Sequence, residues 1–203
     1  MTIDISSMIA KIRTAIDDVK GTVDDDFATD ADMELGQALH HGVEALLLEL
    51  PPTLIEPTVL GSSTTVKGGS MGDGYVELPA DFLRFLQIRL KGWTGTLYEL
   101  MEAGSDEEKM QRSKWSRGSN TKPKAMLDTD TAGKRIVRFW PGSASAELQE
   151  LSYVPMWSEK DGKITSALRK ETEKNIIYRA ASIFLEGKKE DGLADRFKQL
   201  SMM

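Results

Sequence analysis

Apolar residues in the first fifty positions recur at helical spacing. Ile5, Ile9, Ile12 and Ile16 follow one another at intervals of three or four residues, which places them on one face of a helix. A second stripe of this kind begins after an acidic linker at residues 22–29 and ends at Pro51-Pro52, because proline cannot continue the backbone hydrogen-bond ladder. The second stripe consists of Leu35, Leu39, Val43, Leu46, Leu47 and Leu50. The pattern therefore predicts two amphipathic helices at the start of the chain.

Between residue 53 and about residue 157 the pattern changes. Short apolar or alternating runs are separated by clusters of Gly, Pro, Asp and Ser, as is typical of strands joined by turns. We expect strands at residues 64–67, 74–77, 86–91, 95–99, 124–128, 135–140 and 147–154. A short helix is expected at residues 106–115, because Ser105 or Asp106 can accept a hydrogen bond from its first turn.

Helical spacing returns near the end of the chain. A stripe that includes Leu168, Ile176 and Phe184 predicts a helix from Ile164 to about Leu200, which Gly187 and Gly192 break or kink. The segment after Gly187 has two interpretations. It is either an assembly arm that carries apolar and basic side chains to a partner, or a last helix that folds back on its own bundle.

The order of these elements predicts an α+β fold. The helices at the two ends of the chain must pack on each other, because neither end can bury its apolar face alone. The β-rich segment, which is sandwich- or barrel-like, is then an insertion into a helical bundle. The expected divisions are residues 1–52 for the N-terminal helices, 53–160 for the β-rich block, and 161–203 for the C-terminal helix and arm.

The residue inventory argues against an enzyme. The chain contains no cysteine and only two histidines, which are adjacent, so thiolate chemistry is excluded and a Ser-His-Asp triad has little support. We expect no cofactor. No apolar run approaches the length of a membrane span, and the first residues are acidic where a targeting segment is basic. These features predict a protein that folds in the cytoplasm and does not contact a membrane.

The charge is unevenly distributed along the chain. The net charge is −6, yet residues 1–50 carry three basic and eleven acidic side chains, whereas residues 109–138 carry nine basic and two acidic ones. Such asymmetry fits a surface that pairs with another copy of the chain or with nucleic acid. The alternative is two solvated faces whose charges contribute little.

Several short motifs invite a chemical interpretation. His40 and His41 point about 100° apart on a helix, so they cannot chelate one metal ion together. Asp24-Asp25-Asp26 lacks the ligand spacing of a calcium loop, and a solvated linker is the better interpretation. The glycine-rich residues 68–74 lack the Lys-Ser/Thr pair of a phosphate-binding loop. The basic residues around Trp115 suit phosphate contacts but come without a base-reading motif.

Three short elements together resemble a known family. They are Leu78-Pro79-Ala80-Asp81-Phe82-Leu83-Arg84, Phe139-Trp140-Pro141 and Leu151-Ser152-Tyr153, between the helix pair and the closing helix. This order resembles the head–tail connector (adaptor or gatekeeper ring) proteins of tailed bacteriophages, especially short-tailed ones. The resemblance covers most of the chain, and its motifs are packing elements.

The resemblance implies a structural virion protein. Twelve copies would form a ring beneath the portal protein at the head–tail interface, extend the DNA channel, touch passing DNA non-specifically and offer a platform for other tail or ring proteins. Assembly would take place in the host cytoplasm. The basic candidates for the contact between subunits are Lys114, Arg117 and Lys122, and the acidic ones are Asp24, Asp25 and Asp26, with Asp30 and Asp32 beside them. The candidates for portal binding are Phe197, Leu200, Met202 and Met203. The alternative function is a nucleic-acid-binding module that uses residues 109–138.

Overall fold

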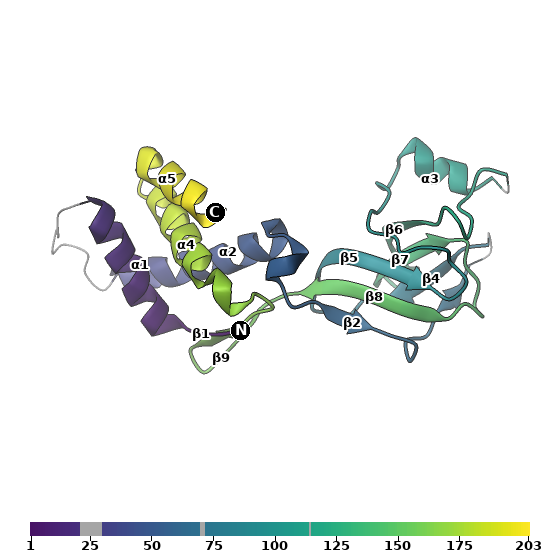
Figure 1. Cartoon of the computed structure of the whole chain (residues 1–203), viewed down its shortest axis with the longest axis horizontal. Helices are drawn as coiled ribbons and strands as arrows, with labels where there is room; N and C mark the ends of the chain where they lie inside the picture. The colour runs from purple at the N-terminus through teal and green to yellow at the C-terminus, as the bar shows by residue number, and fades with distance from the viewer. Residues whose placement is uncertain (21–29, 70–71, 114) are drawn as a thin grey trace. The chain divides into compact units, whose positions relative to one another are not determined.

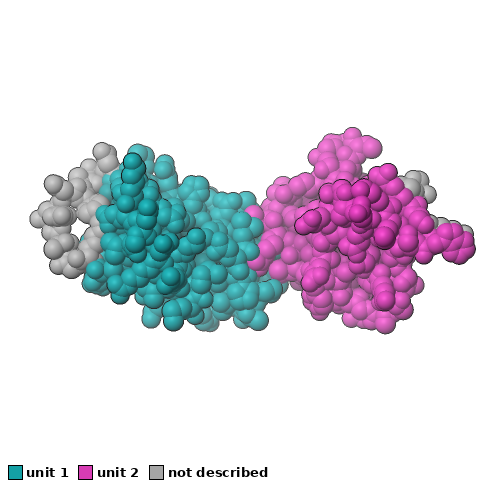
Figure 2. Space-filling view, turned by 90° about the horizontal axis from the view of Figure 1, so that it is seen from above, with its two compact units in different colours: residues 1–57, 154–203 teal, residues 58–153 magenta. Residues whose placement is uncertain are grey.

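A computed structural model describes residues 1–20, 30–69, 72–113 and 115–203. Helices occupy both ends of the chain and antiparallel strands fill its middle (Figure 1), which confirms the predicted α+β class. The contacts divide the chain into two compact units, shown in different colours in Figure 2. Residues 1–57 and 154–203 form the helical unit, and residues 58–153 form the β unit. The sequence pattern places these divisions after residues 52 and 160.

The helical unit contains two long helices from each end of the chain. They are α1 (Ile5–Lys20), α2 (Asp30–Glu49), α4 (Glu173–Gly187) and α5 (Asp191–Ser201). Helix α4 contacts each of the other three, so the terminal segments pack together as predicted. The approach of α2 to α4 is close at Gly42, where a Cβ atom would lie 3.1 Å from the backbone nitrogen of Ala180. Every residue of the predicted stripe on α2 is buried.

A small antiparallel sheet joins the two ends of the chain within the helical unit. Its strand order is β1-β10-β9, formed by Thr2–Asp4, Lys163–Thr165 and Ser158–Lys160. Ile3 pairs with Ile164, and both side chains are buried. The predicted helix from Ile164 is therefore wrong over its first part, because this residue belongs to a strand and α4 begins at Glu173. Short 3₁₀ turns at Pro52–Leu54 and Lys170–Thr172 precede the β unit and α4.

The β unit consists of two antiparallel sheets. One has the order β2-β8-β5, with β2 at Thr58–Leu60, β8 at Leu148–Pro155 and β5 at Phe82–Leu90. The other has the order β3-β4-β7-β6. Its strands are Lys67–Gly68, Gly74–Glu77, Arg135–Trp140 and Lys124–Thr129. The turn between β6 and β7 contains Gly133 at φ +80°. Two hydrogen bonds close it: the Asp130 nitrogen donates to the Lys134 carbonyl, and Asp130 Oδ1 accepts from the Lys134 nitrogen.

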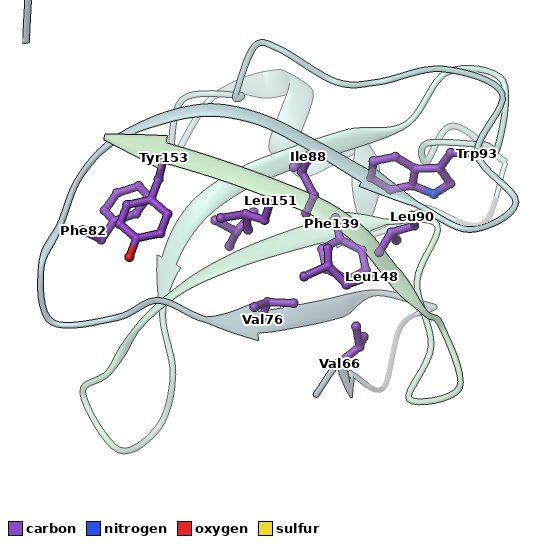
Figure 3. Close-up of a cluster of buried hydrophobic side chains, with 12 residues drawn as sticks. Val66, Val76, Phe82, Ile88, Leu90, Trp93, Phe139, Leu148, Leu151 and Tyr153 are labelled. Carbon is purple, nitrogen blue, oxygen red and sulfur yellow. The ribbon is translucent and has the colours of Figure 1, made fainter. Parts of the chain in front are cut away.

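Both sheets of the β unit contribute to one hydrophobic core (Figure 3). Val76, Val137 and Phe139 come from one sheet, and Ile88 and Leu151 from the other. This packing agrees with the predicted sandwich-like block. Two expected strands differ from the structure: residues 95–99 form only a bridge between Leu97 and Ile88, and residues 64–67 shrink to the two-residue β3.

Candidate interaction surfaces

The motifs behind the family resemblance meet in the core of the β unit. The Tyr153 hydroxyl donates a hydrogen bond to Asp81 Oδ1 at 3.1 Å, and its ring stacks on Phe82 with 5.6 Å between the centroids. Arg135 donates to the Phe82 carbonyl and covers the same ring. The rings of Phe139 and Trp93 pack edge to face, with 5.9 Å between their centroids. These residues therefore contribute packing and hydrogen bonds to the β unit.

Burial and hydrogen bonding act together on Tyr153. Its side chain is 2% exposed, and burial, followed by the bond to Asp81, raises the pKa of the Tyr153 hydroxyl above its ordinary value of 10.0. Each cause favours the neutral phenol over the phenolate. The group is a structural donor in the neutral pH range and is not poised as an acid or base there.

A charged cluster lies between α3 (Asp106–Gln111) and the strands β6 and β7. Arg138 donates to Asp73 Oδ2 at 2.5 Å and to Asp128 Oδ2 at 2.8 Å, and Asp73 is only 2% exposed. Burial opposes the charge of Arg138, but the bonds to both carboxylates outweigh it and raise the pKa of Arg138. These three residues, together with Glu108, Arg112, Met126 and Trp140, line a cavity of about 360 Å³.

Most of the basic segment is neutralised within the β unit. Lys109 lies 2.8 Å from Asp106, Lys124 bonds Glu107, and Arg112 lies 4.0 Å from Glu108. Lys134 lies 3.0 Å from Glu77, which also bonds Lys67. The bonds to Lys67 and Lys134 lower the pKa of Glu77. The sequence segment of nine basic residues therefore presents much less positive charge than its composition indicates.

The charge difference is clearer between the two units than along the sequence. The β unit has 13 basic and 12 acidic side chains, a net charge of +1, while the helical unit has 13 basic and 20 acidic ones, a net charge of −7.

Of the predicted interface residues, Lys122 is exposed and Arg117 half-buried in the β unit. Asp32 on α2 is exposed and lies 2.5 Å from Arg13. Lys114, Asp24, Asp25 and Asp26 lie outside the described residues, and the side chain of Asp30 is not described.

The predicted portal-binding residues differ sharply in exposure. Phe197 is 1% exposed and contacts the ring of Tyr178 on α4 at 6.0 Å, while Leu200 is half-buried. The carbonyl of Ser201 accepts a hydrogen bond from Asn175 at 2.7 Å. Helix α5 thus folds back on α4, the second of the two interpretations of this segment. Phe197 is a core residue here, whereas Met202 and Met203 are 52% and 95% exposed.

The histidines occupy different environments on α2. His40 is half-buried and stacks on Trp157, with 4.8 Å between the ring centroids, and its Nε2 lies 3.1 Å from Glu159 Oε2. His41 is exposed. Within the described ranges, no three His, Asp or Glu residues gather as metal ligands, and no helix there has the length and hydropathy to cross a membrane.

The most exposed tryptophan lies just after α3. Trp115 is 94% exposed, whereas Trp93 and Trp140 are each 5% exposed. The sequence alone does not distinguish an exposed Trp115 from a buried one, because a tryptophan between basic residues has the same local signature in either place. Comparison with known proteins identifies no relative: no protein-family model matches the chain, and no curated protein sequence matches it.

Proposed function

We propose that this chain is a structural ring subunit of a tailed bacteriophage that lies beneath the portal, connects capsid to tail and extends the DNA channel. The observation that carries the proposal is the division of charge between the units, −7 in the helical unit and +1 in the β unit. A closed ring needs two different complementary surfaces on each subunit, and one chain with an acidic unit and a locally basic one supplies both. The family resemblance supports the same function.

The place of the motifs that carry the resemblance is consistent with this function. Leu78–Arg84 and Leu151–Tyr153 contribute Phe82 and Tyr153 to the core of the β unit, and Asp81 bonds the Tyr153 hydroxyl. The motifs thus hold together the unit that would form part of the ring. The nucleic-acid alternative receives less support from the contacts. Five of the nine basic residues at 109–138 have a carboxylate of the same unit within 4.0 Å, and neutralised bases release fewer counterions from DNA.

The test is a charge reversal with rescue. Changing Lys114, Arg117 and Lys122 to Glu should reduce assembly, measured as the mass of the purified chain alone and with its portal protein. Changing Asp24, Asp25 and Asp26 to Lys in the same chain should restore it. Each exposed ion pair contributes only about 0–1 kcal/mol, so the effect requires several charges together. If both variants fold and the second does not rescue the first, this pairing of segments is wrong.

The nucleic-acid alternative has its own readout. An isolated monomer that binds DNA with an affinity that falls steeply with salt would favour it. Subunit assembly that persists at moderate salt, with weak binding of the monomer to DNA, would favour the ring.

A further inference from the structure

Trp115 is an anomaly among the large apolar residues of the β unit. An indole ring that is 94% exposed leaves a large apolar surface in water, and tryptophans in such positions are enriched where proteins bind one another. Met110, on α3, adds a second apolar side chain that is 56% exposed. We call α3 and the turn after it, residues 106–113 and 115–119, the α3 knob. Its two exposed apolar side chains, Met110 and Trp115, lie within residues 109–138, where basic residues outnumber acidic ones.

The α3 knob is held together by its own hydrogen bonds. Gln111 is 3% exposed; its amide donates to the Glu107 carbonyl at 2.9 Å, and its oxygen accepts from the Gly118 nitrogen at 2.7 Å. The Ser105 side chain caps the first turn of α3. Two further bonds close the turn after the helix, from Ser116 Oγ to the Met110 carbonyl and from the Arg117 nitrogen to the Ser113 carbonyl. A fixed support lowers the entropy that Trp115 loses on binding.

The charge around the knob identifies the partner. Residues 106–124 carry six basic and three acidic side chains, a net charge of +3. Among the five paired bases of residues 109–138, Arg112 is the most exposed, at 71%, and its separation of 4.0 Å from Glu108 is the longest, so its charge is the least neutralised. The helical unit, at −7, is the strongly acidic body in the same chain. Opposite charges of this kind steer and orient a contact, while a buried aromatic ring supplies most of the affinity.

We propose that Trp115, flanked by Met110 and Arg112, anchors the α3 knob to the acidic helical unit of a second copy of the chain. This inference rests on the proposed ring function and names the residue on which its subunit contact depends. Because knob and acidic unit are different surfaces, the contact is heterologous and leaves each copy able to bind a neighbour on both sides.

The first experiment measures self-association of the full chain by sedimentation equilibrium at low salt. Trp115→Ala should weaken it by about tenfold or more, since loss of an interfacial tryptophan is among the costliest truncations. Trp115→Phe should retain most of it. The matched control is Tyr98→Ala, which removes an aromatic side chain that is 66% exposed in the same unit but outside the knob, and it should have little effect.

A second experiment locates the surface that the knob meets. The chain has no cysteine, so Asn120→Cys introduces a single thiol beside the knob for a photoactivated crosslinker. The control is Val59→Cys, at a valine of β2 that is 55% exposed. Crosslinks from residue 120 should map to residues 1–57 or 154–203 of another copy and disappear with Trp115→Ala.

The outcomes separate this inference from the proposed function. If Trp115→Ala associates as tightly as the unchanged chain, or if crosslinks from residue 120 reach only the β unit, the inference is wrong and the ring remains possible. If Trp115→Ala loses binding to a DNA duplex but keeps self-association, the knob contacts nucleic acid instead. A chain that stays monomeric at every concentration, both alone and with its portal protein, contradicts both proposals.

Discussion

The helical unit and the β unit differ in how far their charged side chains balance and pair with one another. In the β unit, bases and acids balance almost completely, and buried or half-buried pairs such as Arg138 with Asp73 fix the loops around the sheets. In the helical unit, acids exceed bases by seven. Ion pairs such as Lys11 with Glu173 and Arg13 with Asp32 leave most of that excess in place. One unit thus uses charge to hold its own structure, and the other carries charge that only a partner or counterions can neutralise.

The two units also differ in how their cores are encoded. The helical unit buries stripes of aliphatic residues, with Leu39, Val43 and Leu46 all at 0% exposure. The β unit places rings at its centre, where Phe82 meets Tyr153 and Trp93 meets Phe139. Ring contacts depend on specific geometry as well as on buried area. We therefore expect substitutions in the core of the β unit to be tolerated less well than substitutions in the aliphatic core of the helical unit.

The largest expected effect is the loss of the helical unit. Leu46→Asp puts a carboxylate at a position with 0% exposure, and an unpaired buried charge costs several kcal/mol, about as much as a whole domain's stability. Loss of helical circular dichroism on heating should move to a much lower temperature. Leu48→Asp, two residues later at a site that is 45% exposed, is the control and should melt close to the unchanged chain.

The same variant tests whether the units unfold separately. Trp157 is the only tryptophan of the helical unit, while Trp93, Trp115 and Trp140 belong to the β unit. If the β unit folds by itself, Leu46→Asp should perturb only the fluorescence of Trp157, which Trp157→Phe isolates. An unchanged melting temperature in Leu46→Asp would contradict the burial of α2.

The second effect concerns the end of the chain. Phe197→Ala should destabilise the helical unit by about 3–5 kcal/mol, because a buried phenylalanine leaves a cavity against α4. Met203→Ala, at a side chain that is 95% exposed, should leave the denaturation midpoint unchanged. Equal midpoints for the two variants would instead favour the assembly-arm interpretation, in which Phe197 is free until a partner binds.

Local pattern predicted the elements whose signals lie within their own stretch of sequence. Helix α2 ends at Glu49, before Pro51, and all six residues of its stripe are buried. The strands at residues 74–77 and 135–140 match β4 and β7, because short runs of β-branched and aromatic residues with flanking turn residues mark them locally. Ser105 caps α3 as expected, although the helix ends at Gln111 rather than near Trp115.

The missed elements depend on residues far apart in the chain. Ile164 lies in a strand because Ile3 pairs with it, and no local pattern reveals a partner 161 positions away. A signal was nevertheless present: Asp161-Gly162, with φ of +53° and +70°, joins β9 to β10, and Asp-Gly is a strong hairpin turn sequence. The candidate surfaces were predicted only as charge. Pairing of Lys124 and Lys134 with acids of the same unit required the folded structure.

The third effect tests the internal use of charge in the β unit. Arg138→Met leaves the buried Asp73 without its guanidinium, and breaking a buried pair destabilises by several kcal/mol; with Arg138 25% exposed, we expect about 2–3 kcal/mol. Adding Asp73→Asn should recover part of this loss. Arg112→Met, at a side chain that is 71% exposed, should cost less than about 1 kcal/mol. Denaturant titration of the unchanged chain, Arg138→Met, Asp73→Asn and the double variant gives the coupling energy between positions 73 and 138.

The smallest effect is the dependence of the stability of the β unit on alkaline pH, which comes from Tyr153. The pKa of Tyr153 is raised above 10.0 by burial and by its bond to Asp81, so the folded state keeps the phenolic proton at pH values where the unfolded chain loses it. The resulting stability is fully present below about pH 10, the unfolded pKa, and is lost as the pH rises through the folded pKa.

Tyr153→Phe should cost about 0.5–1.5 kcal/mol near neutral pH for the lost hydrogen bond. Between pH 9 and 11 its free energy of unfolding, measured by urea titration of the β-unit fluorescence, should then fall less than that of the unchanged chain. Parallel curves for the two proteins across this range would show that the phenol titrates alike in the folded and unfolded states, and that its contact with Asp81 contributes no alkaline sensitivity.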